Sequence, residues 1–222
     1  SSREQYPALT SLLEEKGGTT DISDRKRYAA EAFDISSHYD TAIFNYFNGD
    51  DEFLRFKASE RQGSALRYGE NPHQQGQFFG PLDELFEQLN GKALSYNNLV
   101  DIDAAVSLIE EFDDSENAFA ILKHTNACGV AIGTDIKEAY LKAFAADTIS
   151  AFGGVLVANK AITLEAAEEL HKLFFEVLIT PSFDEDALAL LKGKKNRILL
   201  VKKQNLSTTK QFKSLLNGVI VQ

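Results

Sequence analysis

A lysine and a histidine stand side by side directly after an apolar stretch, in Lys123-His124-Thr125-Asn126. Because a histidine exchanges its proton near neutral pH, His124 can act as a general base. The ammonium of Lys123 can stabilise an oxyanion and favours the neutral, basic form of the neighbouring imidazole. This pair is therefore a candidate catalytic site, with the alternative that a Lys-His dipeptide arises by chance on a surface loop.

A second polar stretch follows a short apolar segment and begins with Arg67 and Tyr68. The planar guanidinium of an arginine binds oxyanions at two points, so Arg67 and Tyr68 form a candidate phosphate-binding site. The alternative is a surface turn that is closed by His73. Its turn-forming residues are Gly69, Asn71 and Pro72.

A third stretch, residues 147–154, ends in the glycine pair Gly153 and Gly154. Ser150 and these glycines can present backbone N–H groups to an anion or allow a ligand to approach the backbone closely. A glycine bulge in a buried strand explains the same pattern equally well. The stretch matches neither the Walker phosphate loop nor the GxGxxG dinucleotide fingerprint.

The sequence predicts no metal site. The four histidines, at positions 38, 73, 124 and 171, lie far apart and the chain has a single cysteine, whereas zinc sites combine several such ligands at short spacing. We interpret His38 as a capping residue near a helix end and His171 as a surface residue. Cys128 follows His124 closely enough for a Cys-His nucleophile to be considered, but no orienting group is identifiable.

Composition restricts the class of protein. The chain has 222 residues with 33 acidic and 23 basic side chains, a formal net charge of −10. This balance argues against nucleic-acid binding, which needs a surplus of cations. No apolar run is long enough to span a membrane and no signal peptide is visible. Together with the lone cysteine, these features predict a cytoplasmic protein. Methionine is absent even at position 1, as expected for a segment of a longer chain.

The elements that must position these residues alternate between helix and strand in the second half of the chain. Residues 1–48 are predicted to be mostly helical, with Asp24 capping a helix, and a second helix is predicted to be capped by Asn98. Residues 119–122 are predicted to be a buried strand that enters a loop. Further helices are expected at 136–146 and 163–175, and strands at 53–56, 78–79, within 150–159 and at 177–180. The alternation predicts a layered α/β domain.

Four motifs in this order carry a family resemblance: LRYGENPHQ, LSYNNLVDIDAA, KHTNACGVA and SAFGG. They resemble the bifunctional purine-biosynthesis family that combines AICAR transformylase with IMP cyclohydrolase. The resemblance implies a cytidine-deaminase-like α/β fold preceded by a helical segment. It also implies three parts: a helical remnant of the cyclohydrolase domain (1–48), a linker (49–64), and the first half of the transformylase domain (65–222).

The resemblance also implies an activity, the transfer of a formyl group from the cosubstrate 10-formyltetrahydrofolate to the 5-amino group of AICAR, without a metal. His124 would accept the proton of the attacking amine, Lys123 would stabilise the oxyanion and Asn126 would orient both. The implied substrate-binding residues are Arg67, Tyr68, Gly153 and Glu176. A homodimer is implied as well. The cyclohydrolase catalytic residues are expected to be absent from this chain.

Two positions depart from the family pattern, since Ala127 and Thr148 stand where many members have proline. These changes loosen turns without removing a functional group. One alternative function is that of a deaminase-like zinc hydrolase, although the His-x-Glu and Pro-Cys-x-x-Cys signature is absent. The other is a noncatalytic segment, because the chain by itself is expected to show little or no formyl transfer.

Overall fold

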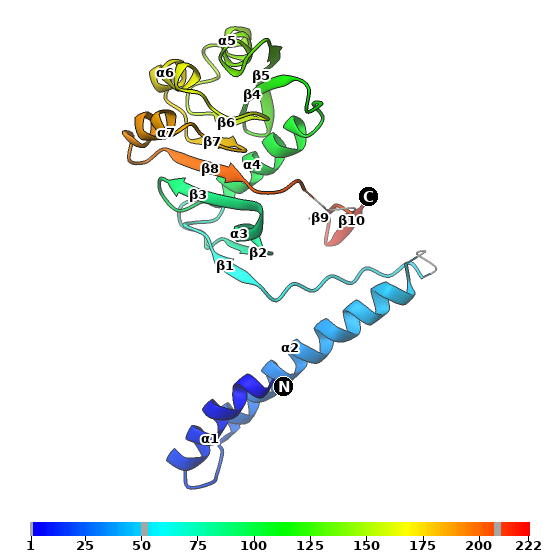
Figure 1. The fold of residues 1–222 in the computed structure, drawn as a ribbon. Coiled ribbons are helices and arrows are strands. Elements are labelled where there is room, and N and C mark those ends of the chain that lie inside the picture. The colour runs from blue at the N-terminus through cyan, green and yellow to red at the C-terminus, as the bar shows by residue number, and fades with distance from the viewer. Residues whose placement is uncertain (1, 50–52, 207–209) are drawn as a thin grey trace. The chain divides into compact units, whose positions relative to one another are not determined.

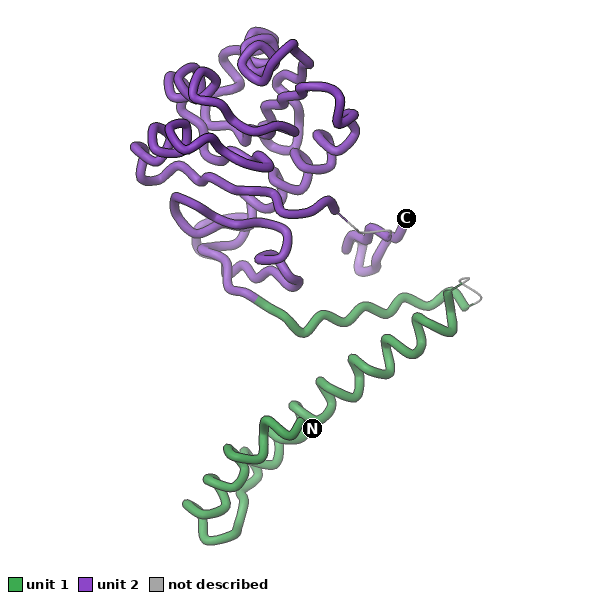
Figure 2. Tube along the Cα trace, viewed as in Figure 1, with its two compact units in different colours: residues 1–63 green, residues 64–222 purple. Residues whose placement is uncertain are grey.

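A computed structural model describes residues 2–49, 53–206 and 210–222. The chain divides into two compact units, Ser1–Gly63 and Ser64–Gln222 (Figure 2). The expected division into residues 1–48, 49–64 and 65–222 remains a prediction as an assignment of domains.

The first unit is helical, as predicted, and contains η1 (Arg3–Gln5), α1 (Tyr6–Glu15) and α2 (Ile22–Phe47). The expected cap of α2 is wrong by three residues: Asp21 is the N-cap, and its Oδ1 accepts the N–H groups of Ser23 and Asp24 at 2.8 and 3.0 Å. Asp21 has the extended backbone that a cap needs, whereas Asp24 is already helical and returns a bond to the Asp21 N–H.

His38 lies inside α2 rather than near its end, so its interpretation as a capping residue is wrong. Its Nδ1 lies 3.0 Å from the Ser59 hydroxyl. The strand predicted at 53–56 is also not formed, because the Asn48 side chain binds the backbone N–H and carbonyl of Phe53. Leu54 is 89% exposed, so this apolar run lacks the buried face that would favour a strand.

A two-stranded sheet of β1 (Gly63–Ala65), which begins at the last residue of the first unit, and β2 (Gln77–Phe79) comes next, and the aromatic residues of β2 predicted a strand there. Six further strands form one mixed sheet in the order β3-β8-β7-β6-β4-β5. Neighbours β6, β7 and β8 run parallel, and the other pairs are antiparallel. Their bounds are β3 (Phe86–Asn90), β4 (Asn117–Lys123), β5 (Asn126–Gly133), β6 (Val155–Ala158), β7 (Val177–Thr180) and β8 (Ile198–Lys202).

Helices cover both faces of this sheet, which confirms the predicted α/β class (Figure 1). Side chains alternate along β4: Phe119 and Ile121 join one buried cluster, while Ala118, Ala120 and Leu122 join the other. The first cluster includes residues of α5 (Ile136–Ala146), α6 (Leu164–Lys172) and α7 (Glu185–Lys192). The second includes residues of α4 (Tyr96–Ile109), with α3 (Leu82–Leu85) contributing at its margin.

The helix and strand patterns of the sequence predicted the bounds of some of these elements correctly and those of others incorrectly. Helix α5 has the predicted bounds, whereas α6 ends at Lys172 because the chain turns extended at Leu173. Helix α4 is capped by Ser95, not Asn98; the Ser95 hydroxyl accepts the Asn98 N–H at 3.3 Å. At the C-terminus, β9 (Phe212–Leu215) and β10 (Gly218–Val221) form an exposed hairpin that the pattern analysis did not predict.

The largest difference concerns the segment after β4. Residues predicted to form a loop are strand β5, which pairs with β4 from Asn126 to Gly133 with a bulge at Cys128. Pattern analysis missed it because its exposed Val130 and Ile132 alternate with small residues instead of polar ones. Gly129 in this strand allows α5 to pack closely, since a Cβ there would lie 1.9 Å from the Ala143 carbonyl oxygen.

Candidate functional site

Four strands of the mixed sheet are in register at one edge. One row of paired positions crosses them: Leu122, Val155, Val177 and Ile198. Because β4 runs antiparallel to β6, its end lies at the edge where β6, β7 and β8 begin. The residues immediately beyond this row are Lys123, Gly154, Glu176 and Arg197. Two of the predicted site residues, Lys123 and Glu176, therefore share a sheet edge.

His124 and Thr125 form the two-residue turn between β4 and β5, with Lys123 and Asn126 paired on either side. Both turn residues have positive φ angles, 51° and 63°, as a type I′ hairpin turn requires. Such a conformation is strained for a β-branched residue like Thr125. The strain is offset by two bonds: the Asp101 carboxylate accepts the Thr125 N–H at 2.8 Å, and the Asn126 amide donates to the His124 carbonyl at 2.8 Å.

Lys123 reaches across to the turn that contains Gly153. Its Nζ donates to the Phe152 carbonyl at 2.8 Å. Gly153 has a φ of +75°, a conformation that favours glycine, and its N–H donates to the Phe174 carbonyl at 2.8 Å. The aromatic rings of Phe152 and Phe174 are in contact, with centroids 5.0 Å apart and planes tilted by 39°, and the two residues are 59% and 55% exposed. Sequence reasoning missed this pair, because neither residue fits a periodic pattern.

Glu176 is held from two sides at the start of β7. The Asn98 side chain donates to its Oε2 at 3.1 Å, and the Lys92 ammonium lies 3.8 Å from the same oxygen. Asn98 is buried, and its own oxygen is occupied by the Ser95 hydroxyl and N–H, which leaves the amide N–H₂ for Glu176. Sequence reasoning assigned Asn98 to helix capping alone. Its second contact depends on the fold, since Glu176 is far along the chain.

Arg67 and Tyr68 adjoin the start of α4. The Arg67 N–H donates to the Leu94 carbonyl at 3.0 Å, and the Tyr96 N–H donates to the Tyr68 carbonyl at 3.2 Å. The Arg67 guanidinium stacks over the Tyr68 ring at 4.6 Å and donates to its hydroxyl at 2.9 Å. The arginine fork is thus exposed but already oriented by its neighbour.

The turn after Tyr68 is closed by Gln74 rather than His73. The side-chain oxygen of Gln74 accepts the Asn71 N–H at 2.9 Å, and its backbone carbonyl accepts the Gly69 N–H at 2.8 Å. The expected closing role of His73 is therefore wrong.

Three of these contacts join α4, or the residues just before it, to parts of the predicted site. The start of α4 touches Arg67 and Tyr68, Asn98 binds Glu176, and Asp101 holds the turn of His124 and Asn126. Glu176 in turn donates its N–H to the Gly154 carbonyl at 3.0 Å, next to Gly153 and the Lys123 contact. The structure therefore brings the predicted residues together; their roles remain predictions.

Two alternatives from the sequence are not supported by the geometry. The Asp147 carboxylate already accepts the N–H groups of Ile149 and Ser150, so that stretch does not present Ser150 to an anion. The Ser150 side chain lowers the pKa of Asp147 accordingly. Cys128 packs against the core beneath α5, and burial raises the pKa of its thiol, which disfavours the thiolate that a nucleophile needs.

The described residues contain no group of three or more His, Cys, Asp or Glu side chains arranged to hold a metal ion. Within the same part of the chain, no helix is long and apolar enough to cross a lipid bilayer.

A sequence profile described as the AICARFT/IMPCHase bienzyme matches residues 1–222. The chain belongs to this family. It is similar to the bifunctional purine biosynthesis protein PurH of Bacteroides thetaiotaomicron, with 53% identity over 221 residues that cover 100% of the chain and 43% of the relative. The PurH proteins of Bacillus cytotoxicus and Chlorobium phaeobacteroides are 43% and 40% identical, and each alignment covers 98% of the chain and 44% of the relative. The chain thus spans less than half the length of these curated relatives.

Within this member of the AICARFT/IMPCHase family, Asp101 is predicted to hold the strained turn that carries His124. Replacing it by alanine removes a bond to a charged acceptor and is expected to speed hydrogen exchange at the Thr125 amide by about tenfold or more. Asp103→Ala, an exposed change on the same helix, is the control and should leave that rate unchanged. Nuclear magnetic resonance measures both rates, and equal exchange in the two variants would contradict the role of Asp101.

Proposed function

We propose that this chain forms part of an AICAR transformylase site, which moves a formyl group from 10-formyltetrahydrofolate to the 5-amino group of AICAR in IMP biosynthesis. The observation that carries the proposal is the convergence of Lys123 and His124 with Arg67, Tyr68 and Glu176 around α4. Family membership supports it, because the matching profile is described as a bienzyme of AICAR transformylase and IMP cyclohydrolase.

In the proposed reaction, the 5-amino nitrogen of AICAR attacks the formyl carbon. A C–N bond forms and the carbonyl oxygen becomes an oxyanion, which the ammonium of Lys123 stabilises. The imidazole of His124 accepts the proton that the amine loses. When the oxyanion collapses, the bond between the formyl carbon and N10 of the folate breaks, and N10 leaves with the proton that His124 had accepted. Asn126 acts as a positioning residue, because its amide binds the His124 carbonyl.

The nucleotide would be held from the other side of α4. The planar Arg67 guanidinium, which lies over the Tyr68 ring, suits a phosphate that accepts two parallel hydrogen bonds. The Glu176 carboxylate suits the N–H groups of a carboxamide or the hydroxyls of a ribose, and Asn98 and Lys92 keep it in place. Gly153 would allow the substrate to approach the backbone.

The exposed rings of Phe152 and Phe174 give this site an apolar surface next to Lys123. An aromatic surface of this kind stabilises a flat heterocycle by stacking, about 0.5–1.5 kcal/mol per pair of rings beyond the area buried. Both proposed substrates carry such rings.

The remaining parts of the proposal concern the longer protein. Residues 1–48 would belong to the cyclohydrolase domain and residues 65–222 to the first half of the transformylase domain. The longer protein would also have IMP cyclohydrolase activity, form a homodimer and act in the cytoplasm. Because the chain spans less than half of its relatives, we expect the 222 residues by themselves to show little or no formyl transfer.

Arg67→Ala in a longer family protein that contains this segment tests the nucleotide site. Loss of hydrogen bonds to a charged phosphate is expected to raise KM for AICAR by about 10- to 100-fold, with a smaller change in kcat. Arg61→Ala is a matched control, since Arg61 pairs with Asp34 at 2.8 Å in the helical unit. Steady-state formyl-transfer kinetics measure both, and an unchanged KM in the Arg67 variant would contradict the proposed binding role.

A further inference from the structure

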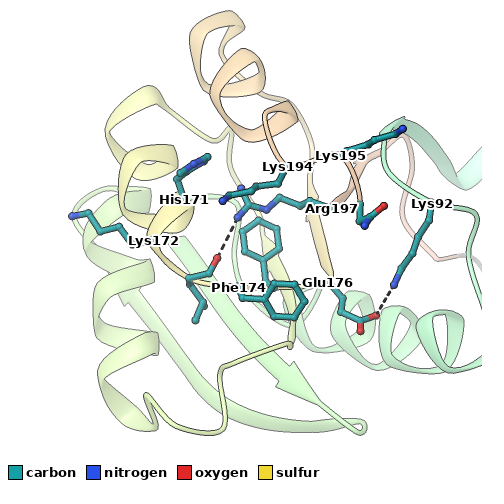
Figure 3. Close-up of a pocket in the computed structure, with 11 residues that line it drawn as sticks. Lys92, His171, Lys172, Phe174, Glu176, Lys194, Lys195 and Arg197 are labelled. Carbon is teal, nitrogen blue, oxygen red and sulfur yellow. Dashed lines mark hydrogen bonds and ion pairs between the residues drawn. The ribbon is translucent and has the colours of Figure 1, made fainter.

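A cavity of about 450 Å³ lies between the end of α6, the segment before β8 and the start of β7 (Figure 3). Five of its lining residues are lysines or arginine: Lys92, Lys172, Lys194, Lys195 and Arg197. Its one acidic lining residue is Glu176. This concentration of positive charge stands out in a chain with a net charge of −10.

Arg197 is the buried member of this group, with only 5% of its surface exposed. Its Nη2 donates to the Leu173 carbonyl at 3.2 Å, and the guanidinium stacks over the Phe175 ring at 4.1 Å. Its Nη1 is buried and has no hydrogen-bond partner. A carbonyl and a ring do not neutralise a full charge, and an uncompensated buried charge is costly. Burial accordingly lowers the pKa of Arg197 to about 10.

His171, in the last turn of α6, also has a buried side-chain atom without a hydrogen-bond partner. Its Nδ1 is buried without a partner, which corrects its interpretation as a simple surface residue. Burial lowers the pKa of His171, and the positive charges of Arg197 and Lys194 lower it further. In Figure 3 these three side chains point into the same region. Positive charges that lie this close together repel one another, and an anion bound between them would offset this repulsion.

The carboxylates near the cavity are used by other lysines. Lys172 pairs with Glu169 at 2.7 Å, and Lys92 lies 3.8 Å from Glu176, which also binds Asn98. Among the described residues, no carboxylate forms an ion pair with Lys194 or Arg197. Lys194 is exposed, so its ammonium is free to turn toward a ligand, whereas Arg197 is fixed.

We propose that this cavity binds a small oxyanion carrying at least two negative charges, a phosphoryl compound or a polycarboxylate, through Lys194 and the fixed charge of Arg197. The site goes beyond the proposed formyl transfer and is different from the phosphate site proposed at Arg67. Because Glu176 lines the cavity as well as the candidate catalytic site, the anion would lie beside the bound nucleotide. Binding by itself requires no turnover, so the proposal can be tested even if the proposed reaction is wrong.

The test uses the 222-residue chain with pyrophosphate and with citrate, at constant ionic strength because salt screens exposed charges. Calorimetry gives the affinity, and the resonances of the His171 ring report occupancy at the site. A bound anion offsets the charges of Arg197 and Lys194, so saturation should raise the pKa of His171. The variant Lys194→Ala loses a hydrogen bond to the charged ligand, so its affinity for the anion should fall by about tenfold or more.

Lys142→Ala is the matched control: Lys142 pairs with Glu138 at 3.0 Å on α5, and its removal should leave affinity unchanged. Arg197→Gln is a second variant that should weaken binding further, provided that circular dichroism shows an intact fold. Binding of pyrophosphate alone would identify a phosphoryl ligand, and binding of citrate alone a polycarboxylate. The proposal is overturned if neither anion raises the pKa of His171 at concentrations on the order of 10 mM, or if Lys194→Ala and Lys142→Ala bind equally well.

Discussion

Replacing His124 by alanine, in a longer family protein that contains this segment, is expected to lower kcat for formyl transfer by about 100- to 10,000-fold, the usual contribution of a general base. Lys123→Ala should lower kcat by about 100- to 1,000-fold, because it removes the charge that stabilises the oxyanion. KM for AICAR should change much less, since neither residue is assigned to nucleotide binding. Steady-state kinetics with both substrates separate the two effects.

The structure supplies a control for this experiment within the same hairpin. Cys128 lies two residues beyond Asn126 and packs against the core, so Cys128→Ala should keep kcat within a few-fold of the parent protein. A large loss in this variant and in the His124 variant, with normal turnover in the Lys123 variant, would favour the Cys-His alternative. Near-normal turnover in both the Lys123 and His124 variants would refute the proposed mechanism.

Gly129→Ala is expected to have the largest effect on stability. The new Cβ would lie 1.9 Å from the Ala143 carbonyl oxygen and 3.0 Å from the Ala146 Cβ, so α5 must move away from β5. Overpacking of a core usually costs about 1–3 kcal/mol, and we expect the upper end because the clash is with backbone. The free energy of unfolding, measured with urea, should fall by that amount.

Gly218→Ala provides the comparison for this change. A Cβ at position 218 would meet its nearest neighbour, the Leu215 carbonyl oxygen, at 3.7 Å, which is ordinary contact. Its effect should stay within about 0.5 kcal/mol, as for most surface substitutions. Equal urea midpoints for the two variants would show that α5 and β5 adapt without cost. The glycine of the KHTNACG motif would then have a role other than close packing.

The sequence predicted those elements whose signals are local. Helix α5 has the predicted bounds because Asp135 caps it and its apolar residues recur at helical spacing. Strand β7 was predicted because three consecutive apolar residues and Thr180, all four of them buried, suit a parallel strand covered on both faces. Family membership was likewise predicted from four short motifs and is confirmed by the profile match.

Predictions failed where a long-range contact decides the local structure. Residues 126–133 form a strand because β4 offers its free edge, and no property of the segment alone requires it. The strand expected at 53–56 is absent because Asn48 binds the backbone of Phe53. Asn98 seemed to be a cap, but its amide group reaches Glu176 on a strand far along the chain.

For the candidate site, the sequence by itself determined which chemical groups are available: an ammonium at Lys123, an imidazole at His124, an arginine fork at Arg67 and a carboxylate at Glu176. Only the tertiary structure decided their arrangement, because strand register and the antiparallel direction of β4 place the end of one strand beside the beginnings of three others. The same register brings Arg197 to this edge and buries it. Periodicity reports which face of an element is apolar, but the pairing between elements determines which charges meet.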